Sequence, residues 1–349
     1  MKHYAGLDVS LEWTSVCVVD EAGQVTREVK VVSEPEALVD FFSSEDGDVV
    51  RIGLEAGPLS QWLHEGLAEA GLPVICVETR HMKAVLSATV NKTDRNDARG
   101  IAQMMRAGLY RPVHVKTVVS QERRMLLTNR KFVVTRLRQV ESNIRGTLRN
   151  FGLKVGVVGR RRFEERILEL VSERATLSML VAPMLRIRAV LVAEYDTLHK
   201  MVLAMVRGDP VCRRLMTVPG VGPIVALTFR ATIDVPARFA KSKTVGAHFG
   251  LTPRKFQSGK IDRMGRISKC GDEMMRTALY EAANSMLTRT TRWSWLKAWA
   301  MGVAKRRGMQ KAKVALARRL GVILHRMWID GTEFHWSREA AQQPAVTVA

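Results

Sequence analysis

The order of apolar segments in the first hundred residues constrains the fold more than any other feature of this sequence. Residues 4–10, 14–20 and 25–32 are short, apolar and partly alternating, which is typical of β-strands, and EAGQ at 21–24 predicts the turn between the second and the third. Helices and strands then alternate, over 34–44 (helix), 48–56 (strand), 59–71 (helix), 73–78 (strand) and a helix that starts at Asp94. The chain therefore begins with a three-stranded antiparallel meander and continues as an α/β protein.

This order belongs to the ribonuclease H-like fold, a mixed sheet with helices on both faces whose carboxylates gather at strand ends and on the last helix. From about residue 120 to 207 the pattern changes to long helical segments, apolar on one face and rich in arginine on the other, which predict a helical hairpin or coiled-coil arm. The remainder is mostly helical and ends in a frayed tail. We therefore expect four parts: residues 1–120 (α/β domain), 121–210 (helical coiled-coil arm), 211–330 (C-terminal domain) and 331–349 (tail).

Charge is divided unevenly along the 349 residues, whose formal net charge is +21. Residues 1–120 hold 12 Lys+Arg against 17 Asp+Glu, whereas residues 121–349 hold 43 against 17 and so carry net +26. The second part is expected to bind a polyanion such as nucleic acid. No membrane partner is expected, because no uninterrupted apolar run approaches the roughly 20 residues that span a bilayer. The four scattered cysteines lack zinc-ligand spacing and are expected to be reduced core thiols.

Four acidic residues stand where the predicted fold would bring them together. Asp8 (AGLDVS) ends the first strand, Glu55 (GLEAGP) ends a neighbouring strand, and Asp94 and Asp97 lie three residues apart at the start of the last helix, on one face. Carboxylates without histidine or cysteine suit a hard cation, so the set predicts a Mg²⁺ or Mn²⁺ site capable of phosphoryl-transfer chemistry.

A simpler interpretation applies to the second pair. Asp94 is a good N-cap residue, and Asp97 in the first turn would favour the helix dipole, so the two could be capping residues only. The combination of four acids at these positions favours metal binding. The neighbouring cations Lys92, Arg95 and Arg99 are then expected to face phosphates that the acids alone would repel.

Two stretches of the basic part predict nucleic-acid contacts. VPGVGP resembles a helix-hairpin-helix turn, in which Gly220 and Gly222 would offer backbone N–H groups to a phosphate, although an ordinary interhelical turn is the alternative. Ser258 lies in a QSG sequence whose surrounding charge could activate it as a nucleophile, or it could simply be a turn residue. The cations around it are Arg254, Lys255, Lys260, Arg263 and Arg266.

The segments GLDVS, LEAGP and KTDRNDA, followed by VPGVGP, GLTPRKFQSG and GRISKCGDEMMRTALYEAA, together resemble the 110 family of insertion-sequence transposases, the DEDD recombinases related to the Piv invertase. The resemblance covers about residues 3–330. It implies a RuvC-like nuclease domain, a coiled-coil arm and a C-terminal transposase domain. It also implies that Asp8, Glu55, Asp94 and Asp97 bind the metal and that Ser258 is the nucleophile.

The resemblance further implies that donor and target DNA are cut and rejoined through a phosphoserine, guided by a structured bridge RNA. A homodimer or homotetramer in the cytoplasm of a bacterium or archaeon, associated with the nucleoid, is expected because recombination joins two duplexes. Two other functions fit the residues. A hydrolytic metal-dependent nuclease would cut without a covalent adduct, and a non-catalytic nucleic-acid-binding scaffold would not cut at all.

Overall fold

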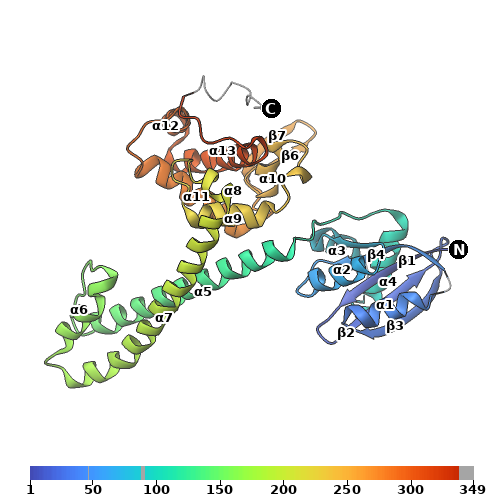
Figure 1. The fold of residues 1–349 in the computed structure, drawn as a ribbon, viewed down its shortest axis with the longest axis horizontal. Coiled ribbons are helices and arrows are strands. Elements are labelled where there is room, and N and C mark those ends of the chain that lie inside the picture. The colour runs from blue at the N-terminus through green and yellow to red at the C-terminus, as the bar shows by residue number, and fades with distance from the viewer. Residues whose placement is uncertain (46, 88–90, 338–349) are drawn as a thin grey trace. The chain divides into compact units, whose positions relative to one another are not determined.

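The computed structural model describes residues 1–45, 47–87 and 91–337, and the chain divides into two compact units, Met1–Lys116 and Thr117–Ala349 (Figure 1). The first unit is a mixed α/β domain. Its elements are β1 (Lys2–Val9), β2 (Trp13–Val19), β3 (Val25–Val32), α1 (Pro35–Ser43), β4 (Asp48–Glu55), α2 (Ser60–Glu69), β5 (Val74–Val77), α3 (Thr79–Leu86) and α4 (Asp94–Ala107). The predicted element order is confirmed, with α3 as an additional helix that the sequence did not indicate.

The sheet of the first unit has the strand order β3-β2-β1-β4-β5. Strands β3, β2 and β1 are antiparallel neighbours, whereas β1, β4 and β5 run parallel. Leu7 of β1 pairs with Leu54 of β4. Asp8 and Glu55 each follow these residues by one position, so the register places the two acids side by side at the carboxyl ends of parallel strands.

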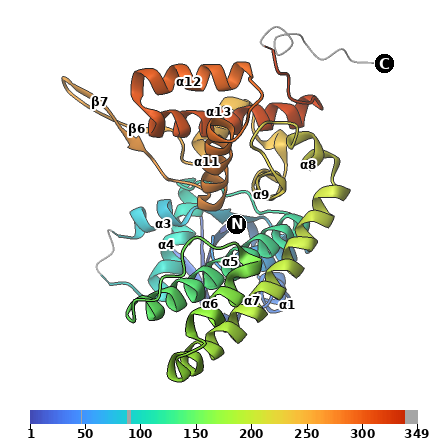
Figure 2. The ribbon, with the colours of Figure 1, turned by 90° about the vertical axis from the view of Figure 1, so that its left-hand side faces the viewer.

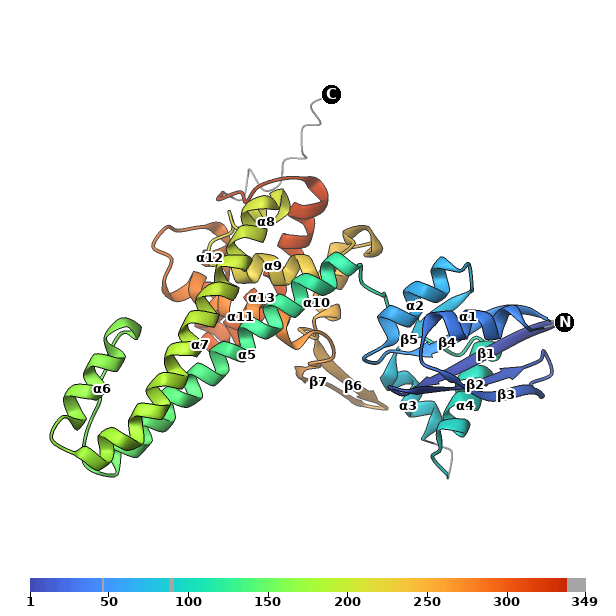
Figure 3. The same ribbon diagram turned by 60° about the horizontal axis from the view of Figure 1, so that its bottom comes forward.

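Helices α1 and α2 lie on one face of the sheet and α4 on the other (Figure 3). Leu7 and Leu54 lie in the core beneath α1 and α2. On the other face, α4 packs directly on glycine residues of β1 and β4, which have no side chain to separate the helix from the sheet. A Cβ on Gly6 would lie 2.2 Å from the carbonyl oxygen of Ala98, and one on Gly53 would lie 2.7 Å from Cγ2 of Ile101. Because strand residues alternate between faces, Asp8 and Glu55 point to the side of α4.

The second unit is mostly helical. Its long helices are α5 (Val118–Arg149) and α7 (Ala175–Gly208), with α6 (Phe163–Val171) between them. The remaining elements are α8 (Pro210–Leu215), α9 (Pro223–Ile233), α10 (Val245–His248), β6 (Pro253–Ser258), β7 (Ile261–Ile267), α11 (Glu273–Thr288), α12 (Trp295–Arg307) and α13 (Met309–Asp330). Short 3₁₀ turns occur at Arg160–Arg162, Pro236–Arg238 and Ser242–Thr244.

Helices α5 and α7 pack along each other in the segment where the sequence predicts a helical arm, and we call this pair the arm. Toward its tip, Ile144 of α5, Phe163 of α6 and Leu185 of α7 share a core cluster. Arg188 is buried between the helices and pairs with Glu141 at 2.8 Å. Coiled-coil geometry within this arm stays a prediction.

Among the described residues, α7 is long and apolar enough to cross a membrane by length and composition, although charged residues interrupt its apolar sequence. One such helix is weak support for a span. The absence of a membrane partner stays a prediction.

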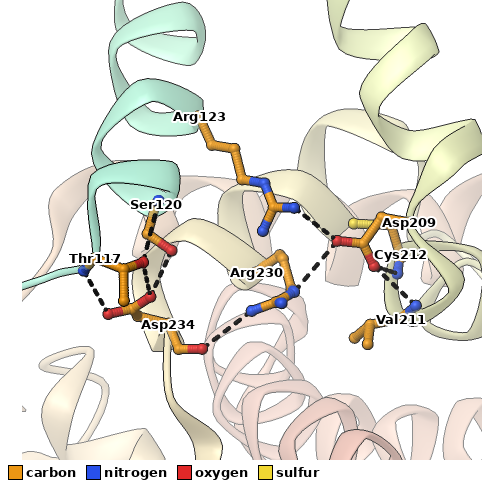
Figure 4. A network of polar contacts seen from close by, with 8 residues as sticks. All are labelled: Thr117, Ser120, Arg123, Asp209, Val211, Cys212, Arg230 and Asp234. Atoms are coloured by element: carbon orange, nitrogen blue, oxygen red, sulfur yellow. Dashed lines mark hydrogen bonds and ion pairs between the residues drawn. The ribbon is translucent and has the colours of Figure 1, made fainter.

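A buried polar network holds the root of the arm against α8 and α9 (Figure 4). Asp234 accepts hydrogen bonds from the backbone N–H of Thr117 (3.0 Å) and from the hydroxyls of Thr117 (2.7 Å) and Ser120 (2.6 Å). Asp209 caps α8 and pairs with Arg123 of α5 at 3.1 Å. Both aspartates are less than a tenth exposed, so each depends on these partners and fixes their positions.

The helices from α8 onwards enclose a second core with α9, α11 and α13 at its centre. Phe334 packs on this core, and its backbone N–H donates to the hydroxyl of Thr217 at 2.9 Å. Residues 331–337 of the expected tail are thus packed, and 338–349 lie outside the described residues. Cys17, Cys76 and Cys212 are buried as expected, whereas Cys270 is exposed, so the expectation of a core thiol is wrong there.

Candidate functional site

The four predicted carboxylates lie on the α4 side of the sheet. Asp8 ends β1, Glu55 ends β4, and Asp94 and Asp97 lie in the first turn of α4. The close packing at Gly6 and Gly53 brings the helix backbone onto the two strands, and so brings the helix acids toward the strand acids. The close approach of the α4 backbone to β1 and β4 therefore positions the helix acids relative to the strand acids.

The acids affect one another electrostatically. Burial, followed by the charges of Asp97, Asp94 and Glu55, raises the pKa of Asp8 to about 6, against a lowering effect of Lys92. The pKa of Glu55 is also raised, first by burial and also by Asp97, while a hydrogen bond with Thr79 acts in the opposite direction. Mutual repulsion of this kind is relieved by a cation.

The interpretation of Asp94 as the N-cap residue is wrong, because Thr93 caps α4. Its hydroxyl accepts from the backbone N–H of Asn96 at 3.1 Å. Asp94 and Asp97 are inside the helix, near Lys30 (3.8 Å) and Lys92 (4.0 Å) respectively. Threonine is a good N-cap residue, so the signal was present in KTDRND.

Glu28 of β3 is a residue of this region that the sequence reasoning missed. It accepts hydrogen bonds from the guanidinium groups of Arg95 and Arg99, one of them at 2.8 Å, and these bonds lower the pKa of Glu28 to about 2. The two arginines therefore tie the first turns of α4 to the sheet. Contact of these two arginines and of Lys92 with phosphate stays a prediction; Glu28 balances one of the two arginine charges.

The residues fit a hard cation by their chemistry, since all donors are carboxylate oxygens whose charges repel one another. Within residues 1–45, 47–87 and 91–337, no group of three or more His, Cys, Asp or Glu has the closeness of a formed metal centre. A cavity of about 520 Å³ lies beside the strand acids, lined by Asp8, Glu55 and the turn residues that follow each strand. The acids thus border an open space that a phosphate group could enter.

The stabilising effect of a divalent cation is expected to depend on pH with a midpoint near 6. The pKa of Asp8 is about 6, so below that value a proton occupies the carboxylate and opposes cation binding. The measurement is the melting temperature of the protein with and without Mn²⁺ from pH 5 to pH 8. A cation-induced shift of constant size across this range would contradict the assignment of Asp8 as a ligand.

Ser258 lies in the second unit, at the end of a β-hairpin that the sequence analysis did not predict. Strands β6 and β7 pair so that Ser258 faces Ile261 across the two-residue turn Gly259-Lys260, where Gly259 has φ +53°. Figure 2 shows the hairpin extending from the helices that carry it. Every residue of β6 is exposed, so the serine hydroxyl is accessible.

The hairpin is strongly basic. Residues 253–267 contain Arg254, Lys255, Lys260, Arg263 and Arg266, with Asp262 as the acidic residue. Lys255 pairs with Asp262 at 3.3 Å, and the guanidinium of Arg254 donates to the carbonyl of Ser268. At the base, a Cβ on Gly250 would lie 2.6 Å from the backbone of Cys270, which explains glycine at this point of the GLTPRKFQSG segment.

The VPGVGP segment connects α8 to α9, with Gly222 as N-cap and Pro223 opening the helix. Gly220 has φ +83°, and a Cβ there would lie 2.4 Å from the carbonyl oxygen of Ala282 in α11. Packing thus explains Gly220. Phosphate binding by this turn stays a prediction.

Comparisons with known proteins agree with these observations. A family model described as Transposase IS116/IS110/IS902 family matches residues 212–299, and a DEDD transposase model of IS110 type matches residues 5–152. The transposase for insertion sequence element IS1111A of Coxiella burnetii is 31% identical over 91% of this chain and 87% of its own length. A protein of Sinorhizobium fredii with a transposase name, y4pF/y4sB, is 30% identical over 72% of this chain and 66% of its own length.

Among solved structures, T. thermophilus RuvC in complex with a Holliday junction substrate matches 32% of this chain and 100% of its own, with 14% identity and a TM-score of 0.26. A similarity this weak carries no argument. The full-length relative and the two family models are sufficient: the chain belongs to the IS110 family of insertion-sequence transposases, enzymes that cut and rejoin DNA.

Proposed function

We propose that this transposase exchanges DNA strands through a covalent phosphoserine at Ser258, assisted by Mg²⁺ or Mn²⁺ held by Asp8, Glu55, Asp94 and Asp97. The observation that carries the proposal is the placement of the four acids at the ends of β1 and β4 and in the first turn of α4, where burial and then their mutual repulsion raise the pKa of Asp8 to about 6. A half-buried carboxylate surrounded by like charges destabilises the fold, and such arrangements cluster at functional sites. The exposed, cation-rich position of Ser258 supports its role as nucleophile.

In the proposed reaction, the Ser258 Oγ attacks the phosphorus of the scissile phosphodiester and loses its proton to solvent. The bond from phosphorus to the 3′ oxygen breaks, so the 5′ phosphate stays on the serine and the released strand takes up a proton as a 3′-hydroxyl. A 3′-hydroxyl of the second duplex then attacks the phosphoserine and restores the serine. When bound, the cation supplies charge stabilisation at the leaving oxygen.

The cations of the hairpin have two tasks in this scheme. They neutralise the phosphate that Ser258 approaches, which a serine hydroxyl needs in order to attack. They also make sequence-neutral contacts to the donor and target DNA. Guidance by a bridge RNA, action in the bacterial or archaeal cytoplasm, and assembly as a homodimer or homotetramer complete the proposal. The net charge of +26 over residues 121–349 supports binding to several nucleic-acid strands.

Ser258→Ala is expected to abolish the covalent adduct between protein and DNA, because alanine offers no oxygen to phosphorus. The measurement is a denaturing gel of labelled element-junction DNA incubated with protein, candidate RNA and Mg²⁺. Ser172→Ala, which removes a hydroxyl from the exposed end of α6, serves as the matched control and should leave the adduct intact.

Label on the wild-type and control proteins, with none on Ser258→Ala, is the expected result. Cleaved DNA without protein-bound label would instead establish a hydrolytic nuclease and leave Ser258 as a turn residue. Binding without any cleavage would favour a nucleic-acid scaffold.

A further inference from the structure

A large groove lies beside the hairpin within the second unit, and of its lining residues Arg266 alone belongs to the hairpin cations of the proposed chemistry. It has a volume of about 1010 Å³ and runs between residues 251–269 and the helices α12 and α13. This volume is at the upper end of small-molecule sites, roughly 300–1,000 Å³. We call it the α13 groove.

The floor of the α13 groove is apolar. Its lining atoms are mainly carbon, supplied by Leu251, Ile267, Trp299, Val314 and Val322. Val314 and Val322 lie eight residues apart on α13, and Lys311 and Arg318 share their face at helical spacing. One side of α13 therefore presents both apolar surface and positive charge to the groove.

The rim of the groove carries charge of one sign. Its lining residues include five cations and no Asp or Glu: Arg266, Lys269, Lys311, Arg318 and Arg319. The guanidinium carbon of Arg319 lies 4.4 Å from the ring centroid of Trp299, so a flat cationic group covers the aromatic ring. Unpaired bases stack on both aromatic rings and guanidinium planes.

Lys269 on the rim has an unusual backbone conformation. It has φ +55°, and Asp234 is the other described non-glycine residue with positive φ. Its backbone N–H donates to the carbonyl of Gly250 at 3.0 Å, which holds the strained conformation in place. Backbone strain persists where the surroundings impose it, and such positions cluster at ligand sites.

The combination of apolar floor and basic rim selects among nucleic acids. A duplex presents phosphates outward and hides its base faces, so it would leave the apolar floor covered only by water or sugar. A single strand can lay its bases on the floor while its phosphates contact the rim, which is how single-strand binding surfaces are built.

We propose that the α13 groove binds a short single-stranded segment of nucleic acid, with its bases on the apolar floor and its phosphates on the five rim cations. This proposal adds a binding site to the proposed function, and it rests on that function only for the choice of nucleic acid as the ligand. RNA and DNA share this chemistry. The floor and rim do not distinguish between them.

The test measures binding of fluorescein-labelled oligo(U) RNA and oligo(dT) DNA to the full chain by fluorescence anisotropy, without Mg²⁺. Lys311→Glu places a negative charge on the exposed rim. Lys305→Glu makes the same change on the exposed end of α12, outside the groove, and is the matched control. Lys311→Glu is expected to weaken single-strand binding by about tenfold or more, and to reduce the salt dependence by about one phosphate contact. The control should change binding less than about twofold.

A second experiment tests the apolar floor of the α13 groove. An oligonucleotide with abasic sites in place of its bases is expected to bind at least about fivefold more weakly, since stacking is lost while the phosphates remain. Equal loss in both lysine variants, equal binding of abasic and intact strands, or a preference for duplex of the same length would each overturn the proposal. Comparing the affinity for oligo(U) with the affinity for oligo(dT) identifies whether the bound strand is RNA or DNA. Failure of the phosphoserine experiment would leave this binding measurement valid, so the two proposals fail separately.

Discussion

Asp8→Asn is expected to abolish strand exchange while making the metal-free protein more stable at pH 7.5. The substitution removes one negatively charged metal ligand from the four proposed carboxylates. The rate of strand exchange should fall by about 10³-fold or more, which corresponds to a loss of several kcal/mol of charge stabilisation. Stability moves in the other direction because Asp8 has a raised pKa in the folded protein. Between pH about 4 and 6 the unfolded chain releases this proton first, so stability falls as the pH rises.

The asparagine variant does not ionise and so escapes this penalty. The rise of the Asp8 pKa from 3.8 to about 6 corresponds to roughly 3 kcal/mol of unfolding free energy. Solvent screens the half-buried carboxyl, which reduces the expected effect to about 1–2 kcal/mol. The measurements are the gel assay and urea unfolding at pH 4.5 and 7.5. Asp40→Asn, on the exposed side of α1, is the control for the loss of one charge. A destabilised Asp8→Asn would contradict the picture of mutual repulsion.

Gly6→Ala is expected to destabilise the first unit by about 3 kcal/mol, the upper range for overpacking a core. The new Cβ would lie 2.2 Å from the carbonyl oxygen of Ala98 and 2.4 Å from the backbone nitrogen of Ala102. Both atoms belong to the backbone of α4 and cannot rotate away. The helix must therefore move off the sheet, and Asp94 and Asp97 move with it.

Hydrogen exchange of the α4 amides and urea unfolding measure this effect, and strand exchange should be lost together with stability. Gly57→Ala is the stability control, because the nearest atom to its Cβ is 3.9 Å away. If Gly6→Ala unfolds at the same urea concentration as the wild type, the close contact of α4 with β1 is not what positions the helix acids.

Apart from α3, the sequence was sufficient to predict the elements of the first unit, because their signals are local. Alternation along β1 and β4 places Leu7 and Leu54 in the core, and the same alternation turns Asp8 and Glu55 to the opposite face. The end of each strand and the start of α4 could be read within a few residues. The prediction of a site formed by Asp8, Glu55, Asp94 and Asp97 rests on these positions and on the element order.

The elements that were missed depend on contacts distant in sequence or lack a hydrophobic period. The β6–β7 hairpin is exposed on both faces, so its strands show no buried alternation, and only the two-residue turn Gly259-Lys260 could have indicated it. Glu28 is separated from Arg95 by 67 residues and looks like an ordinary charged residue of an edge strand. Ion pairs of this kind become visible only when the strand and the helix are placed together.

The arm described above has a mechanical consequence. A helix of 34 residues such as α7 is about 50 Å long, and the Asp209 and Asp234 network fastens the root of the arm to α8 and α9. A rod held at one end behaves as a lever. Rotation by about five degrees at the root would displace the tip by about 4 Å over the length of such a helix, so small rearrangements around these two buried carboxylates are amplified at the far end of the arm.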